Sequence, residues 1–267
     1  MVLLTSIFLT SVFSLSSITP VSAQSRAIKV SSENCTDGRL SEDKVIKILK
    51  GETKGDIKKA EEKVINTTLK KLNLEEWLKT PPLEHKIIFG DIYPNQGEEL
   101  IVAISMGKDN GILAVFSKQD DKLYQITETL DDLVPITSLS LINLPNSKYQ
   151  SLVIEEYLDE RMGGFFEIKI TSIYNFHKKK FNKVWERKNY LKEAKPCKGK
   201  DIKWLIHLEK VDISLISQGK IEVSGINKYW KSNNLDSTAK EEQLIKSNPV
   251  KETYIWDEST SKFKEIS

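Results

Sequence analysis

The pattern that most restricts the fold of this chain is a strand–turn–strand unit that occurs three times after residue 82. In each copy, an aromatic-containing strand precedes a polar turn of three to five residues and a second strand that begins with Lys and then Leu or Phe. The copies cover residues 114–126, 173–185 and 253–266. Apolar and aromatic runs around a polar turn are typical of β-hairpins, because pairing buries one face while the turn stays in water.

A further apolar strand precedes each hairpin, at residues 100–104, 152–156 and 221–226. Repeated units of this kind favour stacked or radially arranged sheets. An ordinary β-meander with similar hairpins is the alternative. We therefore expect residues 83–267 to form a β-rich repeat domain of antiparallel strands and hairpins, either propeller-like or an open sheet fragment.

Residues 24–82 form an N-terminal segment that begins with a polar, loose stretch up to residue 40 and then shows two helical patterns. Ser41 can cap a first helix, and Gly51 stops it. Apolar residues recur at three- and four-residue steps over residues 57–72, and Pro81-Pro82 ends the segment. We predict two helices here and a short one at residues 239–245, so the fold is mainly β with an N-terminal helical segment.

Residues 1–23 contain no Asp, Glu, Lys or Arg and end in Ser22-Ala23, a small-residue pattern typical of a signal peptide cut after Ala23. This predicts a secreted or extracytoplasmic protein of the cell envelope or periplasm. An uncleaved anchor and a buried N-terminal strand or helix are the alternatives. No later segment has 18 consecutive apolar residues, so we expect no membrane span after signal removal.

The chain has two cysteines, Cys35 and Cys197. An exported protein meets an oxidising environment, so the pair is a disulfide candidate, with two free thiols as the alternative. Two cysteines and three scattered histidines do not make a zinc site, so we assign no metal ligand. Lys and Arg total 40 against 38 Asp and Glu, and this near balance argues against a nucleic-acid partner.

Residues 90–102 lead into a strand through a loop with Gly90, Asp91, Gly97 and Glu98. This loop resembles those of secreted β-propeller-like proteins of the FG-GAP and VCBS kind, and Tyr254-Ile255-Trp256-Asp257 with Phe263 is similar to the aromatic hairpin that closes such domains. The resemblance implies a propeller or an open fragment of one.

The same resemblance raises calcium as a cofactor. The candidate oxygen ligands are Asp91, Asn95 and Glu98. Here Ile92, Tyr93 and Pro94 interrupt the acidic alternation of those loops, and calcium usually takes six to eight oxygens. The alternative is a strand-leading turn shaped by Pro94 and Gly97, and we assign no cofactor.

An acidic run at residues 155–160 is the most enzyme-like feature. Two carboxylates flanking a bond could support glycoside hydrolysis, but Glu155 and Glu156 on one strand point to opposite faces. The same stretch suits binding, because Tyr157 and Arg161 belong to residue types that are enriched at interfaces. No nucleophile elbow, P-loop or dinucleotide fingerprint occurs.

The sequence therefore predicts a non-catalytic binding module with a protein or glycan ligand and no assigned catalytic residue. A secreted glycan-directed hydrolase, using acids from residues 155–160 or Glu98 and Glu99, is one alternative. An assembly module that pairs through its sheet edges is another. The candidate binding residues are Asp91, Asn95, Glu98, Glu156, Tyr157 and Arg161.

Overall fold

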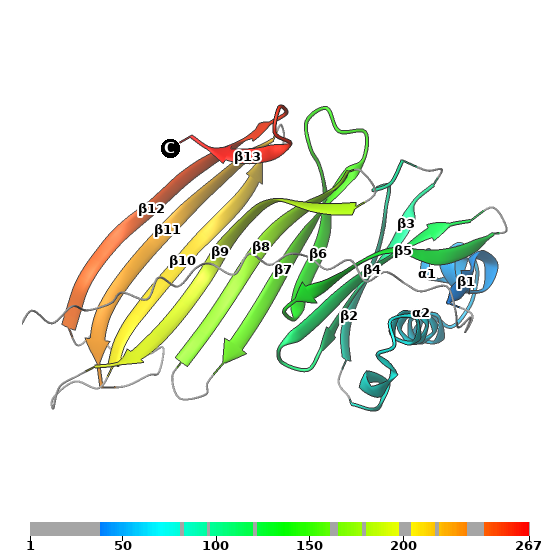
Figure 1. Ribbon diagram of the computed structural model, residues 1–267, viewed down its shortest axis with the longest axis horizontal. Helices are drawn as coiled ribbons and strands as arrows, with labels where there is room; N and C mark the ends of the chain where they lie inside the picture. Colours follow the sequence, from blue (N-terminus) through cyan, green and yellow to red (C-terminus); the bar gives the residue numbers. More distant parts are fainter. Residues whose placement is uncertain are drawn as a thin grey trace, which may run out of the picture.

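The computed structural model describes residues 38–80, 83–94, 97–119, 122–160, 165–177, 180–197, 204–216, 219–233 and 243–266. Within them the chain forms two antiparallel sheets, of five and eight strands, and a short helical segment (Figure 1). The predicted mainly β fold with an N-terminal helical segment is confirmed. The elements are β1 (Arg39–Ser41), η1 (Glu42–Ile46), α1 (Lys47–Leu49), α2 (Ile57–Lys71), η2 (Glu75–Lys79), β2 (Leu83–Gly90), β3 (Glu99–Met106), β4 (Asn110–Lys118), β5 (Leu123–Leu133), β6 (Ile136–Asn143), β7 (Gln150–Glu160), β8 (Phe165–His177), β9 (Lys180–Pro196), β10 (Trp204–Ile216), β11 (Lys220–Ser232), β12 (Gln243–Asp257) and β13 (Lys262–Glu265).

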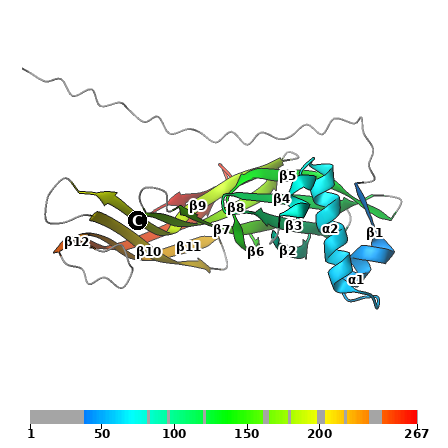
Figure 2. The ribbon, with the colours of Figure 1, turned by 90° about the horizontal axis from the view of Figure 1, so that it is seen from below.

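The first sheet has the strand order β1-β5-β4-β3-β2, and β1 pairs with the first residues of β5. The N-terminal helices cover one of its faces (Figure 2). Helix α2 begins after Asp56, whose Oδ1 accepts a hydrogen bond of 3.2 Å from Lys59 N. Its apolar stripe, which includes Val64 and Leu69, packs in one cluster with Phe116 of β4. Tertiary burial of this stripe therefore supports the predicted second helix.

The other face of the first sheet packs on the beginning of the second sheet. Ile101 and Val115 from the first sheet share a cluster with Ile136, Leu152 and Phe181 from the second. Strands β3 and β4 are thus covered on both faces, which accounts for their nearly continuous apolar sequence. The order of layers is helices, first sheet, second sheet.

The second sheet is a meander in which β6 to β13 are neighbours in sequence order. All three predicted hairpins are present, as β4–β5, β8–β9 and β12–β13, with Phe176 opposite Phe181 and Trp256 opposite Phe263. The three preceding strands, β3, β7 and β11, each pair with the first strand of their hairpin. The arrangement is an open one, which is one of the two forms that the sequence predicts.

The second sheet also curls. Val153 of β7 and Trp185 of β9 share one apolar cluster with Val211 of β10 and Val223 of β11, and β13 lies against β9. The ladder between β8 and β9 changes register between Lys169 and Ile170 and again between Ile173 and Tyr174. Such bulges increase strand twist, so they favour the curl.

The helix predicted at residues 239–245 is wrong over its last three residues. Gln243, Leu244 and Ile245 begin β12, where Leu244 pairs with Trp230 of β11. Cross-strand pairing on a long neighbouring strand outweighs the local helical pattern. Residues 239–242 lie outside the described residues.

Several other predictions fall on residues that the structure does not describe. These are the signal peptide at residues 1–23, Cys35, Asn95 and Arg161. Cys197, directly after β9, is half-buried and forms no disulfide within the described part of the chain. The pairing of Cys35 with Cys197 stays a prediction, as does the domain boundary at residue 82.

Candidate functional site

Three parts of the chain at one end of the second sheet line a pocket of about 340 Å³, which we call the loop-end pocket. They are the β6–β7 connection, the last residues of β8 and the β12–β13 turn. The meander alternates strand direction, so these three parts lie at the same end of the sheet, the upper one in Figure 1. The described lining residues are Pro145, Asn146, Ser147, Tyr149, Gln150, Ser151, Asn175, Phe176, His177, Trp256, Glu258 and Ser261.

A close backbone approach at Gly219 links the β6–β7 connection to the end of β12. Gly219, in the β10–β11 connection, has a φ of +75°, and a Cβ atom there would lie 2.5 Å from Pro145 Cγ and 2.8 Å from Trp256 Cβ. Glycine tolerates both the positive φ and the contact. Trp256 N donates a 2.8 Å hydrogen bond to Gly219 O, which fixes the end of β12 at this point.

The β12–β13 turn is ordered by its own polar side chains. Asp257 Oδ1 accepts hydrogen bonds from Ser259 N at 3.0 Å and Ser259 Oγ at 2.7 Å, and its Oδ2 accepts one from Thr260 Oγ1 at 2.8 Å. The bond from Lys264 and these hydroxyl bonds hold the pKa of Asp257 well below its usual range. Across the pocket, Asn146 Nδ2 donates to Glu258 Oε1, so the turn is also tied to the β6–β7 connection.

The inner wall of the pocket carries two polar atoms that lack partners. Ser151 is 1% exposed, and its Oγ has no hydrogen-bond partner among the described residues. Asn175 Oδ1 is likewise buried and without a partner there. Strands β7 and β8 are antiparallel, and Leu152 pairs with Tyr174. The next positions, Ser151 and Asn175, therefore lie opposite each other, and their side chains are on the same face of the sheet. Buried polar groups are normally hydrogen-bonded, so such a pair indicates a place for a ligand or ordered water.

Aromatic rings form the remaining walls. Phe176 packs on Tyr93, with ring centroids 3.8 Å apart, and Trp256 meets Phe263 in a T-shaped contact at 5.3 Å. The Lys148 ammonium lies 5.3 Å from the centroid of the Tyr149 ring. The pocket therefore combines aromatic walls with several polar side chains, among them the carboxylate of Glu258.

The loop at residues 90–99 is attached to this pocket through Gln150. Asp91 N donates to Gln150 Oε1 at 3.1 Å, and Gln150 N donates to Asp91 O at 2.8 Å. Glu98, by contrast, forms an exposed ion pair with Lys50 at 2.8 Å. Asp91 and Glu98 thus contact different residues, and Asn95 lies outside the described residues.

The buried side chain of Glu99 stabilises the same loop through hydrogen bonds to its backbone. It is fully buried, and its Oε2 accepts hydrogen bonds from Ile92 N at 3.0 Å and Tyr93 N at 3.2 Å. This role supports a structural turn at residues 90–99. No group of three or more metal-ligating side chains occurs among the described residues.

Glu156 and Tyr157 are placed in different surroundings. Glu156 is 5% exposed and its Oε1 accepts a 2.9 Å hydrogen bond from Val134 N in the connection between the two sheets. Burial raises the pKa of Glu156 to about 7, against the opposing effects of that bond and of Lys183. Tyr157 lines a second pocket of about 440 Å³ together with Asp159 and Lys108.

This second pocket, at the junction of the sheets, is the weaker candidate because its key polar groups already have partners. Ser105 Oγ accepts from Ile136 N at 2.8 Å and donates to Ile136 O at 3.2 Å. Tyr157 OH donates to Glu167 Oε1 at 2.7 Å. Arg161, predicted to accompany Tyr157, lies outside the described residues.

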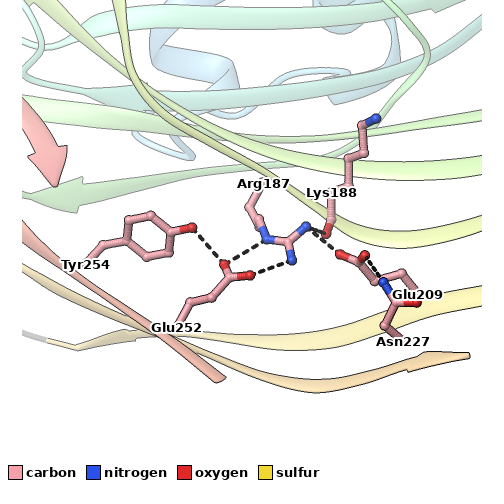
Figure 3. A network of polar contacts seen from close by, with 6 residues as sticks. All are labelled: Arg187, Lys188, Glu209, Asn227, Glu252 and Tyr254. Atoms are coloured by element: carbon pink, nitrogen blue, oxygen red, sulfur yellow. Dashed lines mark hydrogen bonds and ion pairs between the residues drawn. The ribbon is translucent and has the colours of Figure 1, made fainter. Parts of the chain in front are cut away.

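A polar network around Arg187 occupies the curl of the second sheet (Figure 3). Arg187 Nε and Nη2 bind the two oxygens of Glu252 at 2.9 and 2.8 Å, and Nη1 lies 2.5 Å from Glu209 Oε1. Tyr254 OH donates to Glu252, and Asn227 Nδ2 donates to Glu209. Burial opposes ionisation of Glu252, but the bonds from Arg187 and Tyr254 outweigh it and lower the pKa. The network connects β9 to β10, β11 and β12, so we interpret it as structural.

Sequence reasoning missed Ser151, Asn175 and Trp256 as pocket residues. A usable clue was present: in alternating strands, Ser151 and Asn175 stand two residues from Val153 and Ile173, both of which are buried. A polar residue at a core-facing position of a strand needs a partner. No local sequence feature, however, showed that the β6–β7 connection, the end of β8 and the β12–β13 turn lie together.

Comparison with protein-family models and with curated proteins finds no match for this chain. The resemblance to FG-GAP and VCBS repeats therefore stays a prediction. Among the described residues, no helix has the length and apolar character needed to cross a bilayer.

Proposed function

We propose that this chain is a non-catalytic, exported binding module whose ligand occupies the loop-end pocket. The observation that carries the proposal is the buried Ser151 Oγ beside Asn175 Oδ1, both without a hydrogen-bond partner in the described part of the chain, in a pocket walled by aromatic rings. A ligand that hydrogen-bonds to both atoms would remove the free-energy penalty of leaving them unpaired. The turns that surround the pocket are held from outside by Asp257 and Gly219, so the site needs little rearrangement to bind.

The composition of the pocket supports binding over hydrolysis. Glycoside hydrolysis requires two carboxyl groups on either side of one bond. Among the described lining residues, Glu258 supplies the carboxylate, and its Oε1 already accepts a hydrogen bond from Asn146. Glu155, Glu156, Glu98 and Glu99 do not line this pocket.

The test is an amide-shift titration of the ¹⁵N-labelled chain with a library of small polar molecules of several chemical classes. We expect ligands to shift the amides of residues 145–151, 175–177 and 256–261 together. The Ser151→Ala variant should keep or raise the free energy of unfolding, because it removes an unpaired buried hydroxyl, and should weaken binding.

Ser105→Ala is the matched control. Ser105 is also buried, at 5% exposure, but its hydroxyl makes two hydrogen bonds outside the loop-end pocket. We expect this variant to lose about 1 kcal/mol of stability and to bind as the wild type does. If no compound of any class shifts the three groups of amides, the proposed function is wrong.

A further inference from the structure

We infer that the ligand of the loop-end pocket is the ring of a neutral sugar, an inference that rests on the proposed function of the same pocket. Three properties of the described lining carry it: the hydrogen-bonding capacity of the inner wall, an aromatic side wall, and the charge of the rim. Each of them excludes a different class of small molecule.

The inner wall requires a ligand with hydroxyl groups. Ser151 Oγ can donate one hydrogen bond and accept others, while Asn175 Oδ1 can only accept. A sugar hydroxyl both donates and accepts, so two neighbouring hydroxyls of one ring can satisfy both atoms. A purely apolar ligand would leave both atoms unpaired and buried, which costs about 1–3 kcal/mol for each.

The side wall requires an apolar face on the same ligand. Phe176 is already packed on Tyr93, and the ring of Tyr149 has the Lys148 ammonium 5.3 Å from its centroid. Trp256 is half-buried, and its contacts with Phe263 and Gly219 hold it in place. We therefore assign the stacking role to Trp256. Sugar rings combine C–H faces with hydroxyl edges, which matches a Trp wall beside Ser and Asn.

The rim disfavours anionic ligands. Among the described lining residues there is no Lys or Arg, whereas Glu258 places a carboxylate at the edge. Phosphate and carboxylate ligands are normally held by Arg, Lys or a row of backbone N–H groups. A volume of about 340 Å³ lies at the small end for ligand pockets, which suits one ring or the terminus of an oligosaccharide.

The experiment uses the purified full-length chain and four probes: tetramers of α-linked glucose, β-linked glucose, N-acetylglucosamine and galacturonate, the last being anionic. Amide shifts locate binding and calorimetry measures affinity. We expect at least one neutral tetramer to bind at the loop-end pocket and tetragalacturonate to bind at least tenfold more weakly.

Variants of the three pocket residues test the assignment. Ser151→Ala and Asn175→Leu should each weaken the neutral sugar by about threefold to tenfold, as expected for one hydrogen bond. Trp256→Ala should weaken it by at least tenfold, while Trp256→Phe retains part of the affinity. Trp204→Ala is the control, because Trp204 is also half-buried but packs in a separate cluster with Ile206 and Trp230.

The outcomes separate this inference from the proposed function. If non-sugar compounds shift the pocket amides and no neutral sugar does, the sugar assignment is wrong and the binding function stands. If a sugar binds with unchanged affinity in both Ser151→Ala and Trp256→Ala, its placement is wrong. Tetragalacturonate binding as tightly as the neutral tetramers would overturn the charge argument.

Discussion

At the scale of single residues, buried polar groups in this chain fall into two kinds. Glu99 Oε2 accepts hydrogen bonds from two backbone N–H groups and stabilises the loop at residues 90–94, while Arg187 binds two carboxylates and links the strands of the curl. Ser151 Oγ and Asn175 Oδ1, by contrast, have no hydrogen-bond partner among the described residues. A group that contributes nothing to the fold and lines a pocket is the better candidate for ligand contact.

Glu156 makes stability depend on pH. Its pKa is raised by burial from 4.5 to about 7, so the folded chain binds this proton more tightly than the unfolded chain. The contribution of Glu156 to stability is therefore fully present below about pH 4.5 and is lost as the pH rises to about 7. The size of this change is roughly 3 kcal/mol.

The Glu156→Gln variant should remove that dependence, because an amide oxygen can still accept the hydrogen bond from Val134 N but cannot ionise. We expect its stability to exceed that of the wild type at pH 8 and to converge with it near pH 4. Urea denaturation between pH 4 and 8.5 measures this. Glu155→Gln, at the exposed neighbouring position, is the control, and identical pH profiles for wild type and Glu156→Gln would contradict the prediction.

At the scale of elements, hairpins were predictable and their meeting point was not. The three hairpins follow from local alternation and turn residues, and each is present as a pair of antiparallel strands. The pocket depends on the curl of the second sheet, which brings the turn after Trp256 next to Pro145, more than one hundred residues earlier. Long-range packing of this kind leaves no periodic trace in the sequence. For Leu244 and Ile245 the prediction of a helix from the local sequence was wrong, because pairing with β11 makes these residues part of β12.

The absence of a side chain at Gly219 lets Pro145 and Trp256, two residues of the pocket wall, pack closely against its backbone. We expect Gly219→Ala to displace Pro145 or Trp256, to destabilise the fold and to weaken ligand binding, because the new Cβ would lie 2.5 Å from Pro145 Cγ. Urea denaturation and the amide shifts of residues 145–151 measure the two effects.

Gly51→Ala is a closely matched control. Gly51 has a φ of +74°, and a Cβ atom there would have nothing within 4 Å. It should lose about 1–2 kcal/mol from the backbone conformation alone. The excess loss in Gly219→Ala then reports the steric contact, and equal losses in the two variants would show that the contact does not constrain the pocket.

At the scale of the whole molecule, the two sheets differ in how completely they are covered. The first sheet has helices on one face and the second sheet on the other. The outermost strand of the second sheet, β13, is short and pairs with Tyr254–Asp257 of β12. Among the described residues no strand pairs with the outer side of residues 243–252, and residues 243–249 are all exposed. This is the edge through which the assembly alternative would act.

The sequence of that edge opposes assembly. Thr253 O accepts a hydrogen bond from Ile266 N on the outer side, so alternation along β12 turns the backbone of Lys251 and Pro249 outward as well. Pro249 has no N–H to offer a partner strand, and the register shift at Tyr229/Trp230 breaks the ladder near Ile245. Proline, bulges and lysine are the devices by which natural sheets protect their edges.

We therefore expect Pro249→Val to convert this edge into a pairing surface, because it restores an outward N–H beside the exposed Leu244 and Ile245. Light scattering after size-exclusion chromatography should show dimers or larger species that increase with concentration, while the wild type keeps its mass. Pro249→Asp tests whether the restored N–H alone is enough for pairing. It also restores the N–H but places a charge on the edge, so it should behave as the wild type does. If Pro249→Val has the wild-type mass at every concentration, proline does not protect this edge. If the wild type already associates and Pro249→Val changes nothing, the assembly alternative regains its support, because strands would then pair despite the proline.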